Sequence, residues 1–289
     1  MIKFNQIDAV AGIVVLYEPT REVLRNIQSY VEQVKQLFIV DNSENADCLL
    51  VEKIKKINNA EYIGLNENIG IAAALNIGAK RAIEGGYEYL LTMDQDSYAS
   101  PHMVLKLLDV FSHHSMVGIS AAFPVNKLCT KLPTDDKIHK IDVVITSGNL
   151  INLKAYSKVG SFLNKLFIDY VDFEFCFRLR SKGYNIFINN AAILSHSVGE
   201  LKKWRLFGIT YYSTNHPPIR LYYRTRNRFY VRNLYYKEFT SFFMHDLWTF
   251  TKEIIKIILV ESDKLEKLKM IIGGYKDYQN NIFGKTIYG

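Results

Sequence analysis

The sequence is poor in cysteine, the residue that forms the disulfides of small secreted proteins and binds many structural metal ions. Its 289 residues include three cysteines, Cys48, Cys129 and Cys176, an odd and widely scattered set. No two of them have metal-ligand spacing, so reduced thiols are expected rather than a disulfide framework. The N-terminal residues contain no apolar segment of the signal-peptide kind. Together these absences favour a cytoplasmic protein.

Long apolar runs and glycine-rich phosphate loops are also missing. No window approaches the roughly 18 uninterrupted apolar residues of a membrane span. The first apolar run, residues 8–17, is followed by neither G-x-G-x-x-G nor G-x-x-x-x-G-K-[ST]. This excludes a dinucleotide fingerprint and a P-loop. A nucleotide bound by this chain must therefore be held by side chains and a metal ion.

Negative charge is scarce in the last third of the chain. Residues 1–200 carry 20 Lys and Arg against 22 Asp and Glu, whereas residues 201–289 carry 16 against 7. The acidic balance of the first 200 residues argues against nucleic acid as a partner. The basic, aromatic-rich end fits two alternatives, a pair of packed helices with solvated basic faces or a helical appendage on an anionic membrane surface.

The order of apolar runs predicts the fold class. Runs rich in β-branched residues alternate with amphipathic stretches, which indicates an α/β fold with a doubly wound, mostly parallel sheet. We expect a catalytic domain over residues 1–218 and a basic helical region over 219–289. Strands are expected at about 8–17, 36–40, 60–65, 87–93, 116–124, 141–145 and 185–194, and helices at about 20–34, 46–57, 71–84, 101–112, 239–260 and 263–282.

Polar residues follow four successive apolar strands, where the ligands of parallel sheets bind. These tips are Tyr17-Glu18, Asp41-Asn42, Asn66-Glu67-Asn68 and Asp94-Gln95-Asp96. If the extended chain continues through Gln95, the carboxylates of Asp94 and Asp96 point the same way. Such a pair suits a hard cation and, through it, a diphosphate. An acidic turn or a cap for the next helix is the alternative.

A second group of polar residues follows later in the chain. The segment Thr146-Ser147-Gly148-Asn149 ends the strand expected at 141–145, and Asp169, Asp172 and Glu174 precede or open a helix that runs to Gly183. One acid would suffice as a helix cap, so three are surplus. His196 follows the strand expected at 185–194, in a chain that already supplies carboxylates for a cation.

In their order and spacing these motifs resemble glycosyltransferase family 2, the inverting enzymes of the GT-A fold. The resemblance covers about residues 8–230, and the stretch 167–178 is similar to the bacterial rhamnosyltransferase branch. The matching pieces are Val15–Pro19, Asp41-Asn42, Asn66–Gly70, Asp94–Asp96, Thr146–Asn149, Tyr170–Glu174 and His196–Gly199. The chain departs from the common pattern at Val171, where the family usually has Glu, a departure that the rhamnosyltransferase branch shares.

The resemblance implies roles for individual residues. Asp172 resembles the catalytic base, Asp96 and His196 the ligands of Mg²⁺ or Mn²⁺, and Asp41 the residue that bonds a pyrimidine base. Glu174 and Trp204 are expected at the acceptor, with Glu174 pairing with Arg178 as the alternative for that side chain. The residues expected around the nucleotide and donor are Tyr17, Glu18, Asp41, Asn42, Asn68, Gly70, Asp94 and Gln95.

The implied activity is transfer of L-rhamnose from dTDP-L-rhamnose to a polysaccharide or a lipid-linked glycan by metal-assisted, inverting displacement. Transfer of galactose, galactofuranose or N-acetylhexosamine from a UDP-sugar is one alternative. A non-catalytic nucleotide- or glycan-binding module is another, but it would not need Asp172. Sugar-nucleotide synthesis would call for a glycine-rich phosphate loop. Such an enzyme is expected in the cytoplasm, with peripheral contact at the inner face of the cell membrane as an extension.

Overall fold

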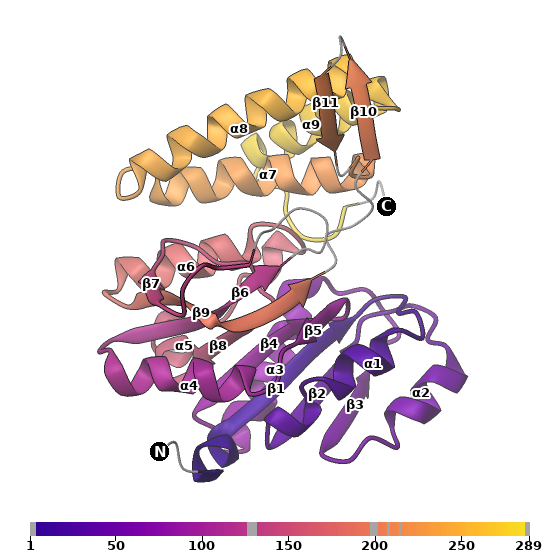
Figure 1. The fold of residues 1–289 in the computed structure, drawn as a ribbon. Coiled ribbons are helices and arrows are strands. Elements are labelled where there is room, and N and C mark those ends of the chain that lie inside the picture. Colours follow the sequence, from indigo (N-terminus) through magenta and orange to yellow (C-terminus); the bar gives the residue numbers. More distant parts are fainter. Residues whose placement is uncertain (1–3, 126–131, 197–201, 207–208, 214, 287–289) are drawn as a thin grey trace. The chain divides into compact units, whose positions relative to one another are not determined.

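The computed structural model describes residues 4–125, 132–196, 202–206, 209–213 and 215–286 (Figure 1). Strands and helices alternate through its first half, as the apolar runs predict. The strands are β1 (Val10–Leu16), β2 (Gln36–Asp41), β3 (Ala60–Gly64), β4 (Tyr89–Asp94), β5 (Ser97–Ala99), β6 (Val117–Val125), β7 (Ile138–Lys140), β8 (Asn149–Asn152), β9 (Asn185–His196), β10 (Lys202–Leu206) and β11 (Ile209–Ser213). The helices are α1 (Val23–Gln28), α2 (Cys48–Ile54), α3 (Ile71–Glu84), α4 (Met103–His113), α5 (Leu153–Val159), α6 (Val171–Ser181), α7 (Pro218–Tyr235), α8 (Thr240–Leu259) and α9 (Lys264–Gln279).

The main sheet has the strand order β3-β2-β1-β4-β8-β6-β9-β5, with β7 paired to β9. The four strands β3, β2, β1 and β4 are mutually parallel, and β6 is parallel to β9. In contrast, β8 runs antiparallel to both β4 and β6. All seven residues of β1 are buried, because helices cover both faces of the sheet (Figure 1). This is the α/β architecture that the strand–helix alternation predicts, with a mixed second half.

The prediction of a strand at 141–145 is wrong, because the chain enters the sheet only later, with β8 from Asn149. Residues 141–145 join no ladder, although Val144 is buried. Since β8 is antiparallel to β4, its first residue pairs with Thr92 near the carboxyl end of β4. The polar segment 146–149 therefore still reaches the edge of the sheet where the parallel strands end, from the beginning of a strand and not from the end of one.

Other boundaries differ in smaller ways. The helix expected at 20–34 is reduced to α1 and a short 3-10 helix, Val31–Gln33. The structure also contains β7 and the β10–β11 hairpin, which are not among the strands expected from the apolar runs. None of the helices in the described ranges is both long and apolar enough to cross a membrane.

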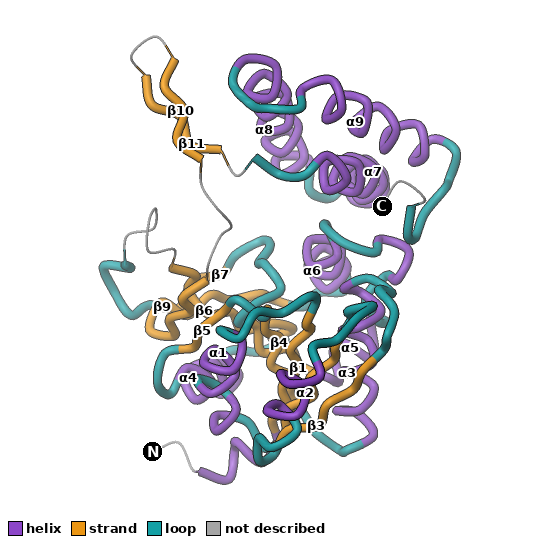
Figure 2. Tube along the Cα trace, turned by 90° about the vertical axis from the view of Figure 1, so that its right-hand side faces the viewer, coloured by secondary structure: helices purple, strands orange, loops and turns teal. Residues whose placement is uncertain are grey.

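The chain forms two compact units whose boundary differs from the expected one at 218/219. Unit 1 comprises residues 1–164 and 172–197, and unit 2 comprises residues 165–171 and 198–289. The short segment 165–171, which we call the strap, thus belongs to the helical unit although residues of unit 1 flank it on both sides. Figure 2 distinguishes the helices α7, α8 and α9 of unit 2 from its hairpin.

The arginines of α7 are largely engaged inside unit 2. Arg228 pairs with Asp246 of α8 at 3.0 Å, and Arg224 pairs with Glu253 of α8 at 2.7 Å. Arg226 is fully buried and donates to the backbone carbonyls of Gly284 and Leu166. These contacts show that three arginines of α7 serve internal packing in unit 2.

The strap has an unusual backbone. Phe167, Asp169 and Tyr170 have φ angles of 64°, 62° and 63°, in the left-handed region. For residues other than glycine this conformation costs about 1–2 kcal/mol each. It persists only where surrounding contacts determine it. Unit 2 must therefore supply contacts that hold the strap in this shape.

Candidate active site

The carboxyl ends of β1 and β2 meet at Asp41. Its carboxylate is 2% exposed, and it accepts hydrogen bonds from the Ser43 amide at 3.0 Å and from the Tyr62 hydroxyl at 2.8 Å. Burial and the bond to Asp41 raise the pKa of Tyr62, so its hydroxyl stays neutral and donates. The Ser43 hydroxyl also accepts from the Glu18 amide. Asp41 is thus a carboxylate held in a fixed position at the carboxyl edge of the sheet.

The expected nucleotide residues Asn42, Asn68 and Gly70 form one connected loop structure. Asn42 donates to the Asn68 side-chain oxygen at 3.0 Å and accepts from the Ile69 amide at 2.9 Å. Asn68 also accepts from the Gly70 amide, and Gly70 adopts a φ of 86° that favours glycine. Asn42 and Asn68 therefore shape the loop before α3 and hold it against the residue that follows β2.

Tyr17 and Gln95 are tied together through the Tyr17 backbone. The Tyr17 amide donates to the Gln95 side-chain oxygen at 2.8 Å, and the Gln95 side-chain nitrogen donates back to the Tyr17 carbonyl at 3.1 Å. The Tyr17 ring is 42% exposed, and Glu18, also exposed, adopts a φ of 45°. Gln95 thus fixes the end of β1 to the end of β4 and leaves the Tyr17 ring available to a ligand.

The acidic tip differs from the extended form considered above. β4 ends at Asp94, and Gln95 and Asp96 form a turn before β5 begins at Ser97. The Asp94 amide donates to the Ser147 hydroxyl at 3.0 Å, and that hydroxyl donates to Ser97 at 2.7 Å. The two carboxylates are therefore displayed by a turn that the 146–149 segment holds in place.

The backbones of the two expected metal ligands, Asp96 and His196, are close together where β5 joins the sheet. Ser97, which follows Asp96, pairs directly with His196 in the antiparallel β5–β9 ladder. Within the described residues no three His, Cys, Asp or Glu side chains cluster as a metal site, and the His196 side chain lies outside that description. Carboxylates from Asp94 and Asp96 nevertheless suit Mg²⁺ or Mn²⁺, which commonly bind one or two protein carboxylates and substrate phosphates.

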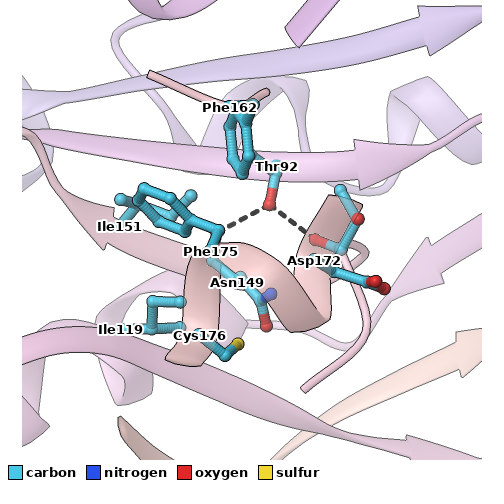
Figure 3. A pocket seen from close by; sticks show the side chains of 9 residues that line it. Thr92, Ile119, Asn149, Ile151, Phe162, Asp172, Phe175 and Cys176 are labelled. Carbon is cyan, nitrogen blue, oxygen red and sulfur yellow. Dashed lines mark hydrogen bonds between the residues drawn. The ribbon is translucent and has the colours of Figure 1, made fainter. Parts of the chain in front are cut away.

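Asp172 lies in the first turn of α6 and lines a small cavity in unit 1 (Figure 3). The cavity has a volume of about 10 Å³, near the size of one water molecule. Thr92 of β4 and Asn149 of β8 line it as well, so one carboxylate faces the end of the sheet. The start of a helix stabilises a negatively charged side chain, which favours the carboxylate form that a general base needs before the reaction.

Two further side chains of the cavity limit its chemistry. Asn149 is 4% exposed and donates to the Ile145 carbonyl, whereas its side-chain oxygen has no partner among the described residues. Cys176 is fully buried, and burial raises the pKa of its thiol. The thiol is therefore protonated and unsuited to nucleophilic attack. Asp172 is the residue of this cavity that can act as a base.

Glu174 belongs to an ion pair. Its carboxylate is 1% exposed and binds the Arg178 guanidinium with two parallel bonds of 3.0 and 2.8 Å. Arg178 also donates to the carbonyls of Val159 and Gly160 after α5. The pairing alternative for Glu174 is confirmed, and its expected acceptor contact stays a prediction. Trp204 lies on β10, but its side chain is outside the described residues.

Some residues that build the site escape sequence reasoning. The Tyr62 hydroxyl, on β3, donates a hydrogen bond to Asp41, and the Ser97 hydroxyl accepts one from Ser147. Neither Tyr62 nor Ser97 belongs to a recognisable motif. Asn149 is part of the polar segment 146–149, but its unsatisfied buried oxygen depends on the packing of α6 against β8 and is invisible in the sequence.

Comparison with known proteins gives the class of this fold and site. Residues 13–181 match Glycosyl transferase family 2, so the chain belongs to that family and is a glycosyltransferase. Two solved structures share the GT-A fold at low identity. GalNAc-T7 with UDP, GalNAc and Mn²⁺ has a TM-score of 0.61 at 14% identity, over 94% of this chain and 56% of that one. Staphylococcus aureus TarS 1-349 with UDP-GlcNAc has a TM-score of 0.61 at 15% identity, over 94% and 81%.

Two curated relatives refine the comparison. The dTDP-rhamnosyl transferase RfbF of Shigella flexneri is 30% identical over 241 residues, which cover 76% of this chain and 78% of that protein. The poly-beta-1,6-N-acetyl-D-glucosamine synthase of Staphylococcus aureus is 26% identical over 127 residues, 43% of this chain and 30% of the synthase. The resemblance to the rhamnosyltransferase branch is thereby confirmed, and the chain is a hexosyltransferase.

Proposed function

We propose that this glycosyltransferase moves L-rhamnose from dTDP-L-rhamnose to a glycan or lipid-linked acceptor with inversion at the anomeric carbon. The observation that carries the proposal is the 30% identity to the dTDP-rhamnosyl transferase, which spans 76% of this chain. The site supports it with one carboxylate, Asp172, at the start of α6 and a polar edge formed by β1, β2 and β4.

In this mechanism Asp172 acts as the general base. The acceptor hydroxyl oxygen forms a bond to the anomeric carbon while the bond from that carbon to the diphosphate oxygen breaks. The hydroxyl proton passes to the Asp172 carboxylate, and the nucleoside diphosphate leaves with the bonding electrons. The Glu174–Arg178 pair fixes α6 against the end of α5, which keeps Asp172 at a defined position.

The donor is held at the opposite side of the site. In the proposal, Asp41 accepts a hydrogen bond from a pyrimidine N3–H, and the Tyr17 ring covers the base. Asp94, Asp96 and His196 would hold Mg²⁺ or Mn²⁺. When bound, such an ion stabilises the departing diphosphate by neutralising its charge.

Calorimetry with nucleotides tests the donor. We expect dTDP-rhamnose to bind more tightly than UDP-glucose or UDP-galactose, and metal-dependent hydrolysis should follow the same order. Comparing dTDP, UDP and dUDP separates the two chemical differences between the donors, the thymine methyl group and the ribose 2′-hydroxyl. Tighter binding of UDP than of both deoxynucleotides would replace the rhamnosyl proposal by transfer from a UDP-sugar, the kind of donor bound in the TarS structure.

We also propose that α8 contacts an anionic membrane surface, where a lipid-linked acceptor would lie. The acids of α8, Asp246 and Glu253, point inward to the arginines of α7. Its outward face carries Lys252, positioned over the Trp248 ring at 4.9 Å. The exposed apolar side chains recur at helical spacing, and they are Met244, Trp248, Ile255, Ile258 and Leu259. An apolar stripe with lysine and without acids fits the interface of an anionic bilayer.

Vesicle sedimentation tests this surface. Binding to anionic vesicles should exceed binding to neutral ones and weaken with salt. Trp248→Glu should reduce it, whereas Leu49→Glu, on a similarly exposed apolar residue of α2, serves as the matched control. If Trp248→Glu binds vesicles as well as the unsubstituted protein does, α8 is not the membrane-binding surface. If the variant instead loses self-association, the exposed face of α8 binds a second copy of the chain.

A further inference from the structure

The strap ends where the proposed base begins. Residues 165–171 belong to unit 2, and the next residue along the chain is Asp172. Val171 is already the first residue of α6, so no flexible linker separates the strap from the helix that carries the base. The backbone of the strap therefore leads directly into the first turn of α6.

A single side chain of α7 bonds most of the strap. The Asn227 side-chain nitrogen lies within hydrogen-bond distance of three strap carbonyls, those of Leu166 at 2.8 Å, Ile168 at 2.7 Å and Asp169 at 3.0 Å. These carbonyls converge because Phe167 and Asp169 adopt left-handed conformations. Asn227 is fully buried, so water cannot replace these bonds without opening the unit.

Neighbouring contacts orient this amide and support the same segment. Arg226 donates to the Asn227 side-chain oxygen at 3.1 Å, which fixes which end of the amide faces the strap. The Phe167 ring stacks on Tyr223 of α7 with centroids 5.1 Å apart. The Tyr170 hydroxyl donates to Asp246 of α8 at 2.7 Å. The strap is thus held from two helices, with Asn227 at its centre.

We propose that Asn227 is a positioning residue for the transfer reaction. It holds the left-handed strap, and the strap aims Asp172. This inference rests on the proposed role of Asp172 as the base. Asn227 is fully buried and bonds the strap, so we expect its loss to lower kcat and leave nucleotide affinity unchanged. A misplacement of about 1 Å in a reacting group can lower the rate about a hundredfold, and we expect a loss between ~10-fold and ~100-fold.

Asn227→Asp is the test variant, because it keeps the shape of the side chain and replaces the donor by a charge that repels the three carbonyls. Asn233→Asp, an exposed position on the same helix, is the matched control. Hydrogen exchange measured on the full chain should accelerate over residues 166–175 in Asn227→Asp alone. The kcat for dTDP-rhamnose turnover should fall while the Kd of dTDP stays constant.

A double-mutant cycle separates positioning from general damage. If Asn227 acts through the base, Asn227→Asp should cost little further activity once Asp172→Asn is present. An equal loss in both backgrounds, or unchanged exchange over 166–175, would overturn the inference. Normal turnover by Asp172→Asn would instead refute the proposed base. Should Asn227→Asp not fold, Asn227→Ser, whose hydroxyl can still donate to one carbonyl, replaces it with a smaller expected loss.

Discussion

Two adjacent glycines of α9 offer a direct test of the packing of unit 2. A Cβ atom added at Gly274 would meet the Tyr222 carbonyl oxygen well inside contact distance and would lie 3.2 Å from the Arg226 amide nitrogen. These are backbone atoms of α7 and cannot rotate away. At Gly273 the nearest atom is the Tyr222 ring carbon Cδ2 at 3.7 Å, an ordinary contact.

The expected free energies have opposite signs. Alanine stabilises a helix interior by about 1 kcal/mol relative to glycine, so Gly273→Ala should raise the free energy of unfolding by about that amount. Overpacking costs about 1–3 kcal/mol, and a rigid backbone neighbour places Gly274→Ala at the upper end. Its net loss is then ~2 kcal/mol, after the helix gain of about 1 kcal/mol is subtracted.

Urea unfolding followed by tryptophan fluorescence measures this difference. Both tryptophans of the chain, Trp204 and Trp248, belong to unit 2, so selective tryptophan excitation reports on that unit alone. With a slope of about 2 kcal/mol per molar urea, the Gly274→Ala midpoint should fall by about 1 M and the Gly273→Ala midpoint should rise. Equal midpoints for the two variants would refute the close approach of α7 and α9.

Other predictions address the chemistry and the pH dependence. Asp172→Asn should lower kcat at least about a hundredfold with donor affinity retained, and normal turnover in this variant with a dead Glu174→Gln would transfer the role to Glu174. Asp96→Ala should abolish activity and EDTA should do so reversibly, whereas full activity in EDTA without bound metal would exclude the ion. Burial, together with nearby arginines, lowers the pKa of His216 from 6.5 to about 4. The unfolded chain then binds more protons between these values, so stability should fall as pH drops through them, and His216→Gln should flatten that slope in urea titrations.

The first half of the fold could be predicted because its strands are local and continuous. The run at 8–17 and the alanine-rich helix at 71–84 carry their own periodicity, and the structure places β1 and α3 there. β8 could not be predicted in this way. Its ladder depends on β4 and β6, which lie far away in the sequence, whereas the more apolar residues 141–145 lack a strand to pair with.

The same distinction applies to charged residues. The acids at strand ends are visible in the sequence, and Asp41 indeed lies at the carboxyl end of β2. The partners of the α7 arginines are not visible, because Asp246 and Glu253 lie on another helix. A count of charges therefore overstates how much positive charge reaches the surface. The turn at Gln95 and Asp96 likewise depends on Ser147, which approaches from the loop before β8.

The discontinuity of unit 2 has a consequence for recombination between relatives. A chimera that takes residues 198–289 from one parent and everything before them from another would join a strap and an α7 of different origin. Carbonyls bonded by Asn227 are present in any sequence, whereas the Phe167–Tyr223 stack and the Asp169–Arg220 ion pair require matching side chains. The C-terminal helices and residues 165–171 should therefore be inherited together, as two separate segments of one exchangeable block.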